Sequence, residues 1–141
     1  MLAKLSNCEM HKLVQIVRFE SARKLPKVPV GHPCGNVYGL AFKLEVHVEG
    51  KVNSETGFVI DFGHIESAIK PTYDLIDHNY LNDIKGLENP TSEVLVEWIW
   101  NNLYKHFNNE WNFDKNQNKI CNLVKLVLWE NEVSRVEFKG N

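Results

Sequence analysis

The sequence has no long hydrophobic run and no cluster of positive charge. Its uninterrupted apolar stretches are only a few residues long, whereas a membrane-spanning helix needs about 20. No basic run exceeds two residues, and the formal net charge is −2. A surface that binds nucleic acid normally concentrates Lys and Arg. Neither a membrane nor a nucleic acid is therefore expected as a partner.

Cysteine is also scarce, and no pair has the CxxC spacing. The three cysteines are Cys8, Cys34 and Cys121. Residues 1–12 contain no charged stretch followed by an apolar one, so no secretory signal is expected. An odd number of irregularly spaced cysteines in such a chain indicates reduced thiols. We therefore expect a cytoplasmic location, with Cys8 and Cys121 as structural residues.

The composition is that of one folded domain. The chain has 141 residues, of which 43% are hydrophobic and 24% charged. This length and this balance suit a single core and argue against disorder. No repeat of 20–50 residues is present. We expect one domain over residues 1–141.

Hydrophobic periodicity predicts strands first, then helices, then strands again. Strict alternation over residues 41–49 places Phe42, Leu44, Val46 and Val48 on one face of a half-buried strand. A weaker alternation predicts a strand over residues 13–19. Residues 26–39, rich in Pro and Gly, form a long candidate functional loop. Residues 58–62 are expected to end a short strand.

Two helices and a closing hairpin are expected to follow. The first helix spans residues 63–76, and Pro71 should kink or break it. The second begins with Asn89 as N-cap and Pro90 at the first helical position, and it ends near Phe107. Residues 108–118 are interpreted as a mobile loop, and residues 123–130 and 133–138 as a hairpin. The order predicts an α+β fold, an antiparallel four-stranded sheet with both helices on one face.

Several short motifs together resemble one family. They are F-E-S-A at residues 19–22, L-P at 25–26, G-H-x-C-G at 31–35, T-G-F-V-I-D-F at 56–62, D-H-x-x-L-N at 77–82 and N-P-T-S-E at 89–93. In this order and spacing they resemble the 6-pyruvoyl and 6-carboxytetrahydropterin synthases. The likeness runs over residues 19–100 and thinly to 130. It is nearer to the bacterial 6-carboxytetrahydropterin branch, which feeds queuosine and other 7-deazaguanines.

The resemblance implies a fold, an activity and an assembly. The family has the tunnelling fold (T-fold), with ββααββ order, and its subunits form trimers stacked into hexamers with active sites between subunits. Its substrate is a reduced pterin of the dihydroneopterin triphosphate type, and its activity is that of a carbon–carbon lyase. A homo-oligomer, a trimer or a hexamer, with a pterin ligand is therefore expected here.

The resemblance also assigns roles to residues. Cys34 matches the catalytic thiol, and Asp77 and His78 match residues that reach in from a neighbouring subunit. Such groups can move protons near neutral pH when their surroundings tune them. Glu130 matches the carboxylate that clamps the pterin, through a bidentate hydrogen-bonded pair. Asn131 departs from the family, which has threonine after this glutamate.

Three further residues are predicted to bind the substrate: Thr91, Ser92 and Arg23. Thr91 and Ser92 lie near the pterin pocket in the family. Arg23 stands where the family has a zinc-binding histidine. Its guanidinium is expected to contact a substrate oxygen as a fixed positive charge. The alternative is a surface arginine beside Lys24 and Lys27.

All three zinc histidines of the family are replaced. Arg23, Tyr38 and Leu40 occupy the three positions. Leucine has no donor atom and arginine stays protonated, so this set does not suit zinc. No cofactor is therefore predicted. A relocated zinc site is the alternative, but the histidines outside the D-H motif have no metal-ligand spacing: His11, His32, His47, His64 and His106. His47 is interpreted as polar surface or tunnel lining.

These observations lead to one main hypothesis and to open alternatives. The main hypothesis is a 6-carboxytetrahydropterin synthase-like protein that binds a reduced pterin without the usual zinc. Whether it remains an enzyme is open. It would catalyse a zinc-independent lyase or retro-aldol step, or it would bind a pterin or purine, or join a zinc-bearing paralogue, without chemistry. A purely structural T-fold subunit is the third possibility.

Overall fold

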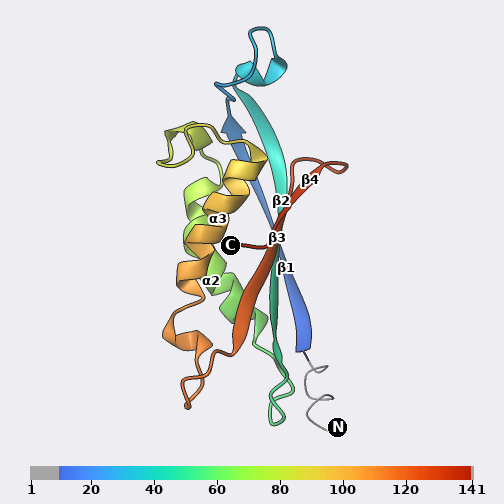
Figure 1. Cartoon of the computed structure of the whole chain (residues 1–141), viewed down its shortest axis with the longest axis vertical. Coiled ribbons are helices and arrows are strands. Elements are labelled where there is room, and N and C mark those ends of the chain that lie inside the picture. The colour runs from blue at the N-terminus through green and yellow to red at the C-terminus, as the bar shows by residue number, and fades with distance from the viewer. Residues whose placement is uncertain (1–9, 141) are drawn as a thin grey trace.

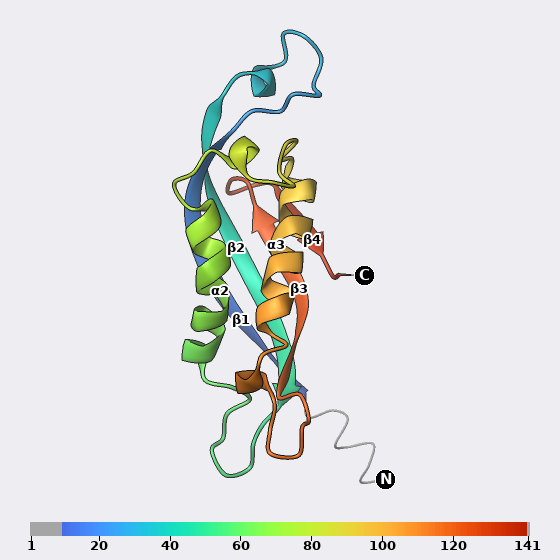
Figure 2. The ribbon, with the colours of Figure 1, turned by 90° about the vertical axis from the view of Figure 1, so that its left-hand side faces the viewer.

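The fold is a four-stranded antiparallel sheet with two helices on one face. The computed structural model describes residues 10–140, so Cys8 lies outside the described residues. The strands follow the chain in the order β1-β2-β3-β4. The elements are β1 (Met10–Arg23), β2 (Tyr38–Lys51), α2 (Phe62–Ile76), α3 (Ser92–His106), β3 (Cys121–Trp129) and β4 (Arg135–Phe138). Figures 1 and 2 show both helices on the same side of the sheet, which confirms the predicted α+β class.

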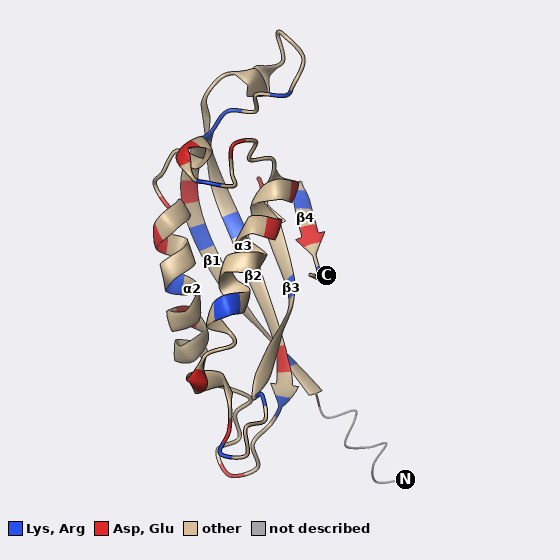
Figure 3. Cartoon of the chain, turned by 60° about the vertical axis from the view of Figure 1, so that its left-hand side comes forward, with Lys and Arg blue, Asp and Glu red and all other residues tan. Residues whose placement is uncertain are grey.

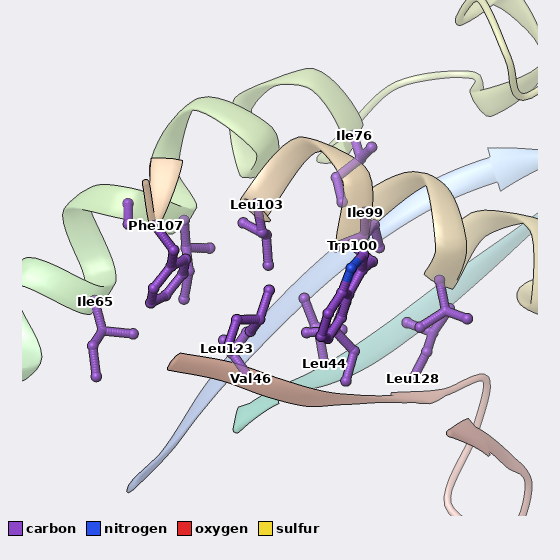
Figure 4. Packing of buried hydrophobic residues seen from close by; sticks show 14 of the residues in the cluster. Leu44, Val46, Ile65, Ile76, Ile99, Trp100, Leu103, Phe107, Leu123 and Leu128 are labelled. Atoms are coloured by element: carbon purple, nitrogen blue, oxygen red, sulfur yellow. The ribbon is translucent and has the colours of Figure 1, made fainter. Parts of the chain in front are cut away.

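The core lies between this sheet face and the helices. The alternating residues Phe42, Leu44, Val46 and Val48 of β2 are all buried, as predicted. Side chains from both helices point toward them, and Figure 4 shows Leu103 of α3 among these contacts. Burial of such side chains contributes about 1.5–3 kcal/mol each. The amphipathic pattern of these elements therefore determines which face the helices cover.

Both helices, and the residues before them, differ in detail from what the sequence predicted. α2 is continuous from Phe62 to Ile76 with Pro71 inside it, so of the kink or break expected at Pro71 the break does not occur. Residues 58–62 form no strand before it. The N-cap of α3 is Thr91, whose hydroxyl accepts from Val94 N at 3.2 Å, and not Asn89. The Thr91 hydroxyl thereby satisfies a backbone N–H of the first turn, which is the role of an N-cap side chain.

The two loops at the C-terminal end of the chain are well bonded. The loop 108–118, expected to be mobile, contains a 3₁₀ helix at Glu110–Asn112. Asn112 is fully buried and its side chain bonds Phe107 O and Cys121 O. In the hairpin turn, Asn131 Oδ1 accepts from Val133 N and Ser134 N at 2.9 and 2.8 Å. An asparagine side chain therefore closes a turn that has no glycine.

The long loop between β1 and β2 extends beyond the helices (Figure 1). It carries a 3₁₀ helix at Pro33–Gly35, so Cys34 belongs to a short ordered segment. Lys and Arg positions and Asp and Glu positions are scattered over the ribbon of the described chain (Figure 3). None of the helices within residues 10–140 has the length and apolarity to cross a membrane.

Candidate functional site

Three substituted positions lie together at the end of the β1–β2 ladder. Arg23 pairs directly with Tyr38, and Ser21 pairs with Leu40. Directly opposed residues of an antiparallel pair share one face, and residues two apart on a strand do too. Arg23, Tyr38 and Leu40 are therefore neighbours on the core side of the sheet. A guanidinium, a phenol and an aliphatic group do not form a zinc donor set.

Arg23 is buried, with 2% of its surface exposed. Its Nε donates to the Tyr38 hydroxyl at 2.9 Å. Its Nη1 donates to Pro90 O at 3.1 Å and to Ser92 Oγ at 3.2 Å, and its Nη2 donates to Glu130 Oε1 at 2.9 Å. Four of the five N–H donors of the guanidinium are thus used within the chain. The interpretation of Arg23 as a surface residue is wrong.

Glu130 directly follows β3 and faces Arg23. Its Oε1 accepts from both Arg23 Nη2 and Ser92 Oγ. Burial alone would raise the pKa of the Glu130 carboxyl, but these hydrogen bonds and the charge of Arg23 hold that pKa below its ordinary value. The carboxylate is one-third exposed, with 33% of its side chain accessible. Glu130 therefore remains charged and still reaches the surrounding space.

Tyr38 links Arg23 to Cys34. Its hydroxyl accepts from Arg23 and also forms a hydrogen bond with the Cys34 side chain. Burial and the bond to Cys34 raise the pKa of Tyr38, and they outweigh the opposing effect of Arg23. The loop position of Cys34 is held from both sides, because Cys34 N donates to His32 Nδ1 and Cys34 O accepts from Leu25 N. A continuous polar chain therefore joins the thiol to the carboxylate.

A pocket of about 890 Å³ opens onto this chain. Its lining includes Arg23, Cys34, Tyr38, Leu40 and Glu130. This volume is in the range of small-molecule sites. The pocket thus brings together the predicted thiol, the predicted carboxylate and all three substituted residues, Arg23, Tyr38 and Leu40.

Two further predicted residues, Ser92 and Thr91, lie at the start of α3. Ser92 is buried at the first position of α3 and reaches Glu130 through its hydroxyl. Thr91 uses its hydroxyl to cap the same helix. Neither residue lines the pocket itself. Their direct contribution is to hold Glu130 and to begin the helix.

Asp77 and His78 lie apart from this pocket in the single chain. Asp77 Oδ2 and His78 Nδ1 are 2.8 Å apart, and 75% of the His78 side chain is exposed. His78 has a positive φ of 56° and donates its backbone N–H to Glu20 O. Asp77 Oδ1 accepts from Glu20 N at 3.0 Å. The pair is therefore fastened to the outer edge of β1, facing a different pocket of about 560 Å³.

The electrostatics of this pair suit proton transfer. The hydrogen bond that His78 donates to Asp77, together with the negative charge of Asp77, raises the pKa of His78 above its ordinary value. Burial would raise the pKa of Asp77, but bonds from Glu20 N, His78 and Tyr73 lower it overall. The carboxylate thus orients the imidazole and favours its protonated form.

The described residues offer no substitute metal site. Within residues 10–140, no three His, Cys, Asp or Glu side chains are grouped so that they could hold a metal ion. His47, interpreted as polar surface or tunnel lining, is 8% exposed and its Nε2 lies 2.9 Å from Glu45 Oε1. Trp129 Nε1 also donates to Glu45 at 2.7 Å. The surface interpretation of His47 is wrong, because this network on the other sheet face covers it.

The comparisons with known proteins agree with the fold and the motifs. The family model described as 6-pyruvoyl tetrahydropterin synthase matches residues 12–141. The chain belongs to the 6-pyruvoyl tetrahydropterin synthase family. A solved 6-pyruvoyl tetrahydropterin synthase from Caenorhabditis elegans has a TM-score of 0.78 at 19% identity, over 94% of this chain and 96% of that one. This likeness shows the T-fold.

Two curated proteins are similar to this chain in sequence. A 6-carboxy-5,6,7,8-tetrahydropterin synthase from Synechocystis is 38% identical over 87 residues, 58% of this chain and 66% of that protein. The chain thus matches slightly less than two thirds of that relative. A dihydroneopterin monophosphate aldolase from Pyrococcus furiosus is 30% identical over 103 residues, 73% of this chain and 78% of that protein.

Sequence reasoning missed the bonds that Arg23 makes. The motifs predicted Cys34 and Glu130 as site residues, and the resemblance predicted that Arg23 and Tyr38 stand where the family has histidine. Nothing in their spacing indicated that Arg23 would bond both Tyr38 and Glu130. The available signal was chemical: an arginine and a glutamate that share one site form a favourable pair.

Proposed function

We propose that this protein binds a reduced pterin in the Cys34–Glu130 pocket, as a metal-free relative of 6-carboxytetrahydropterin synthase. The observation that carries the proposal is the Glu130 carboxylate. It is held in its charged form at the side of a pocket of about 890 Å³ that also contains Cys34. The names of the similar proteins, which concern reduced pterins, support this ligand class.

Recognition would use the carboxylate of Glu130. The 2-amino-pyrimidinone edge of a pterin carries two parallel N–H donors, which match a carboxylate. Oε1 of Glu130 already accepts two protein hydrogen bonds. No hydrogen bond to Oε2 is found from residues 10–140, so this oxygen is open to a ligand. Leu40 and Tyr38 would contact the flat ring from the pocket wall.

The catalytic version of the proposal is a carbon–carbon lyase step, such as a retro-aldol cleavage of the pterin side chain. A base must remove a proton from a side-chain hydroxyl, and an acid must return one to carbon. Cys34 would act from this pocket, and the Asp77–His78 pair would act from a neighbouring copy. A homo-oligomer, a trimer or hexamer as in the family, would bring them together. This step would proceed without zinc, because Arg23, Tyr38 and Leu40 do not fit that metal.

The alternative is binding without chemistry. It is favoured by the two polar side chains at the positions that match zinc ligands, which already bond one another: Arg23 Nε donates to the Tyr38 hydroxyl at 2.9 Å. A zinc ion would stabilise developing negative charge by several kcal/mol, and about 1.4 kcal/mol corresponds to a tenfold change in rate. A protein that holds a pterin or purine, or that joins a zinc-bearing paralogue, needs no such stabilisation. For either version, we propose that the protein takes part in queuosine or 7-deazaguanine synthesis.

The experiment is turnover of dihydroneopterin triphosphate by the metal-stripped protein, with products identified by mass spectrometry with and without added zinc. Product without metal, abolished by Cys34→Ala, supports the lyase. Unchanged turnover in Cys34→Ala contradicts the assigned thiol. Pterin affinity is measured in parallel by calorimetry. Binding without product supports the non-catalytic alternative, and no binding with or without zinc overturns the proposed function.

A further inference from the structure

In this chain the Glu130 carboxylate already binds a guanidinium group, that of Arg23. The guanidinium of Arg23 is held by Glu130 Oε1, Ser92 Oγ and the carbonyl of Pro90, at 2.9, 3.2 and 3.1 Å. It comes from the end of β1, whereas its partners come from α3, the segment before it and the end of β3. These three acceptors form a cradle for a planar group with several N–H donors.

Aromatic rings complete the cradle. The Cζ atom of Arg23 lies 5.4 Å from the centroid of the Tyr38 ring and 5.6 Å from that of Phe42. Flat cations stack on aromatic faces, and so do flat heterocycles. The site therefore combines a carboxylate, two further acceptors and aromatic walls. That is the complement of a guanidine group, whether the group is a side chain or part of a small molecule.

A pterin carries such a group within its ring. The 2-amino carbon and its two flanking nitrogens form a cyclic guanidine, with parallel N–H donors on the edge that faces a carboxylate. Arginine offers the same fork geometry with a full positive charge. In this chain that guanidinium belongs to Arg23, so it is covalently linked to the protein that forms the site. A ligand that forms hydrogen bonds with both carboxylate oxygens of Glu130 must therefore compete with Arg23 for Oε1.

We propose that Arg23 is an internal ligand of a guanidine-recognising site made by Glu130, Ser92 and Pro90, and that it limits the binding of cyclic guanidines such as pterins. The pterin part rests on the proposed function, but the guanidine site itself does not. Arg23 is then a specificity-determining residue, because it leaves Glu130 Oε2 as the one carboxylate oxygen free of Arg23 and Ser92.

The first test uses methylguanidinium as the probe and the melting temperature as the readout. Arg23→Ala removes the internal ligand and opens its space. Millimolar methylguanidinium should raise the melting temperature of Arg23→Ala, and it should leave the wild type unchanged because its site is filled. Equal concentrations of tetramethylammonium control for ionic strength. Arg23→Met, which fills a similar volume without charge, should also fail to respond.

The dependence on the carboxylate gives the second arm. Adding Glu130→Gln to Arg23→Ala should abolish the response to methylguanidinium. If Arg23→Ala folds only in the presence of methylguanidinium, that recovery supports the proposal. No stabilisation and no recovery of Arg23→Ala by the probe would overturn it.

The third arm compares two ligands that differ at the recognised edge. Dihydroneopterin carries the 2-amino group, and the matched lumazine carries a 2-oxo group instead. The affinity for dihydroneopterin should be at least tenfold higher in Arg23→Ala than in the wild type, with no gain for the lumazine. Equal or weaker dihydroneopterin binding in Arg23→Ala contradicts the competition. If no variant binds a pterin while methylguanidinium still stabilises Arg23→Ala, the proposed function fails and the guanidine site stands.

Discussion

At the scale of the residue, the buried charge of Arg23 is the feature that determines the chemistry of the site. Taking a charge out of water costs several kcal/mol unless a counter-charge and hydrogen bonds offset it. Here Glu130 supplies the counter-charge, and Tyr38, Ser92 and Pro90 supply the remaining acceptors. Arg23 and Glu130 therefore depend on one another, and removing either one leaves the other unpaired.

Glu130→Gln should lower the free energy of unfolding by about 3 kcal/mol, because it leaves the Arg23 cation buried without its counter-charge. This is the lower end of the range for a broken buried pair, since Glu130 is one-third exposed. Urea denaturation measures it. The matched control is Glu132→Gln, at an exposed position two residues later, which should change stability by less than about 0.5 kcal/mol. Equal effects of the two substitutions would contradict the role of the pair.

The same pair should make stability depend on pH in the acidic range. The pKa of Glu130 in the folded protein lies below its ordinary value of 4.5. Its contribution is therefore fully present above the unfolded pKa and is lost as the pH falls through the lowered folded pKa. The stability difference between the wild type and Glu130→Gln should shrink as the pH falls below 4.5. Urea denaturation at each pH measures this difference. If the difference stays constant over this range, the charge of Glu130 does not contribute to stability.

At the scale of the element, single polar side chains fasten segments that contain little hydrophobic surface. Asn112 joins the end of α3 to the start of β3, because its Nδ2 donates to Phe107 O and Cys121 O while its Oδ1 accepts from Cys121 N. Asp77 fastens the segment after α2 to the edge of β1 through Glu20 N. These contacts, rather than helix or strand propensity, position the loops.

Asn112→Ala should cost about 3 kcal/mol of stability or more. It leaves buried backbone groups of Phe107 and Cys121 without their side-chain partner, at about 1–3 kcal/mol for each unsatisfied group. Thermal or urea unfolding measures the loss. Asn109→Ala is the matched control, because Asn109 is exposed and its side chain makes no cap hydrogen bond. A loss in Asn112→Ala as small as in the control would show that the loop does not depend on this side chain.

The register of the β1–β2 ladder makes a gain of metal binding possible. Positions 23, 38 and 40 share one face, with 23 and 38 directly paired. The triple variant Arg23→His, Tyr38→His, Leu40→His should therefore bind one zinc ion per chain, since three imidazoles with an open position suit zinc. Competition with a chromophoric chelator measures the affinity.

The variant with only Arg23→His and Tyr38→His is its control and should bind zinc more weakly. A triple variant that folds but takes up no zinc would show that the three side chains do not converge.

At the scale of the whole molecule, the candidate catalytic groups are divided between two pockets. Cys34 and Glu130 face one pocket, whereas His78 faces another. Only Gly39, Leu40 and Ala41 line both. One chain therefore does not bring the thiol and the imidazole to the same ligand, and the catalytic version of the proposal requires two copies.

Mixed assemblies test this division. Cys34→Ala and His78→Ala should each lose lyase turnover, and refolding them together should restore part of it, because some shared sites then have both residues intact. Product formation measured by mass spectrometry gives the result. Each variant refolded alone is the control. If mixed assemblies form and turnover stays absent, the thiol and the imidazole do not act in a site shared between copies.

Much of this protein was predictable from residue patterns. Alternation at Phe42, Leu44, Val46 and Val48 predicted the buried face of β2, and helical spacing predicted α2 and α3 to within a few residues. The motifs predicted the family. These features are local, because strand and helix periods are properties of short segments. The errors were local as well: Thr91 rather than Asn89 caps α3, because its hydroxyl reaches the backbone N–H of Val94.

The sequence by itself determined the fold class and the family, since each depends on the identity and spacing of residues along the chain. Only the tertiary structure decided which groups surround Arg23. Arg23 and Glu130 are separated by 107 positions, and Arg23 and Ser92 by 69. Their contact arises because β1, α3 and β3 pack around one core, and a buried charge then takes whichever counter-charge that packing provides.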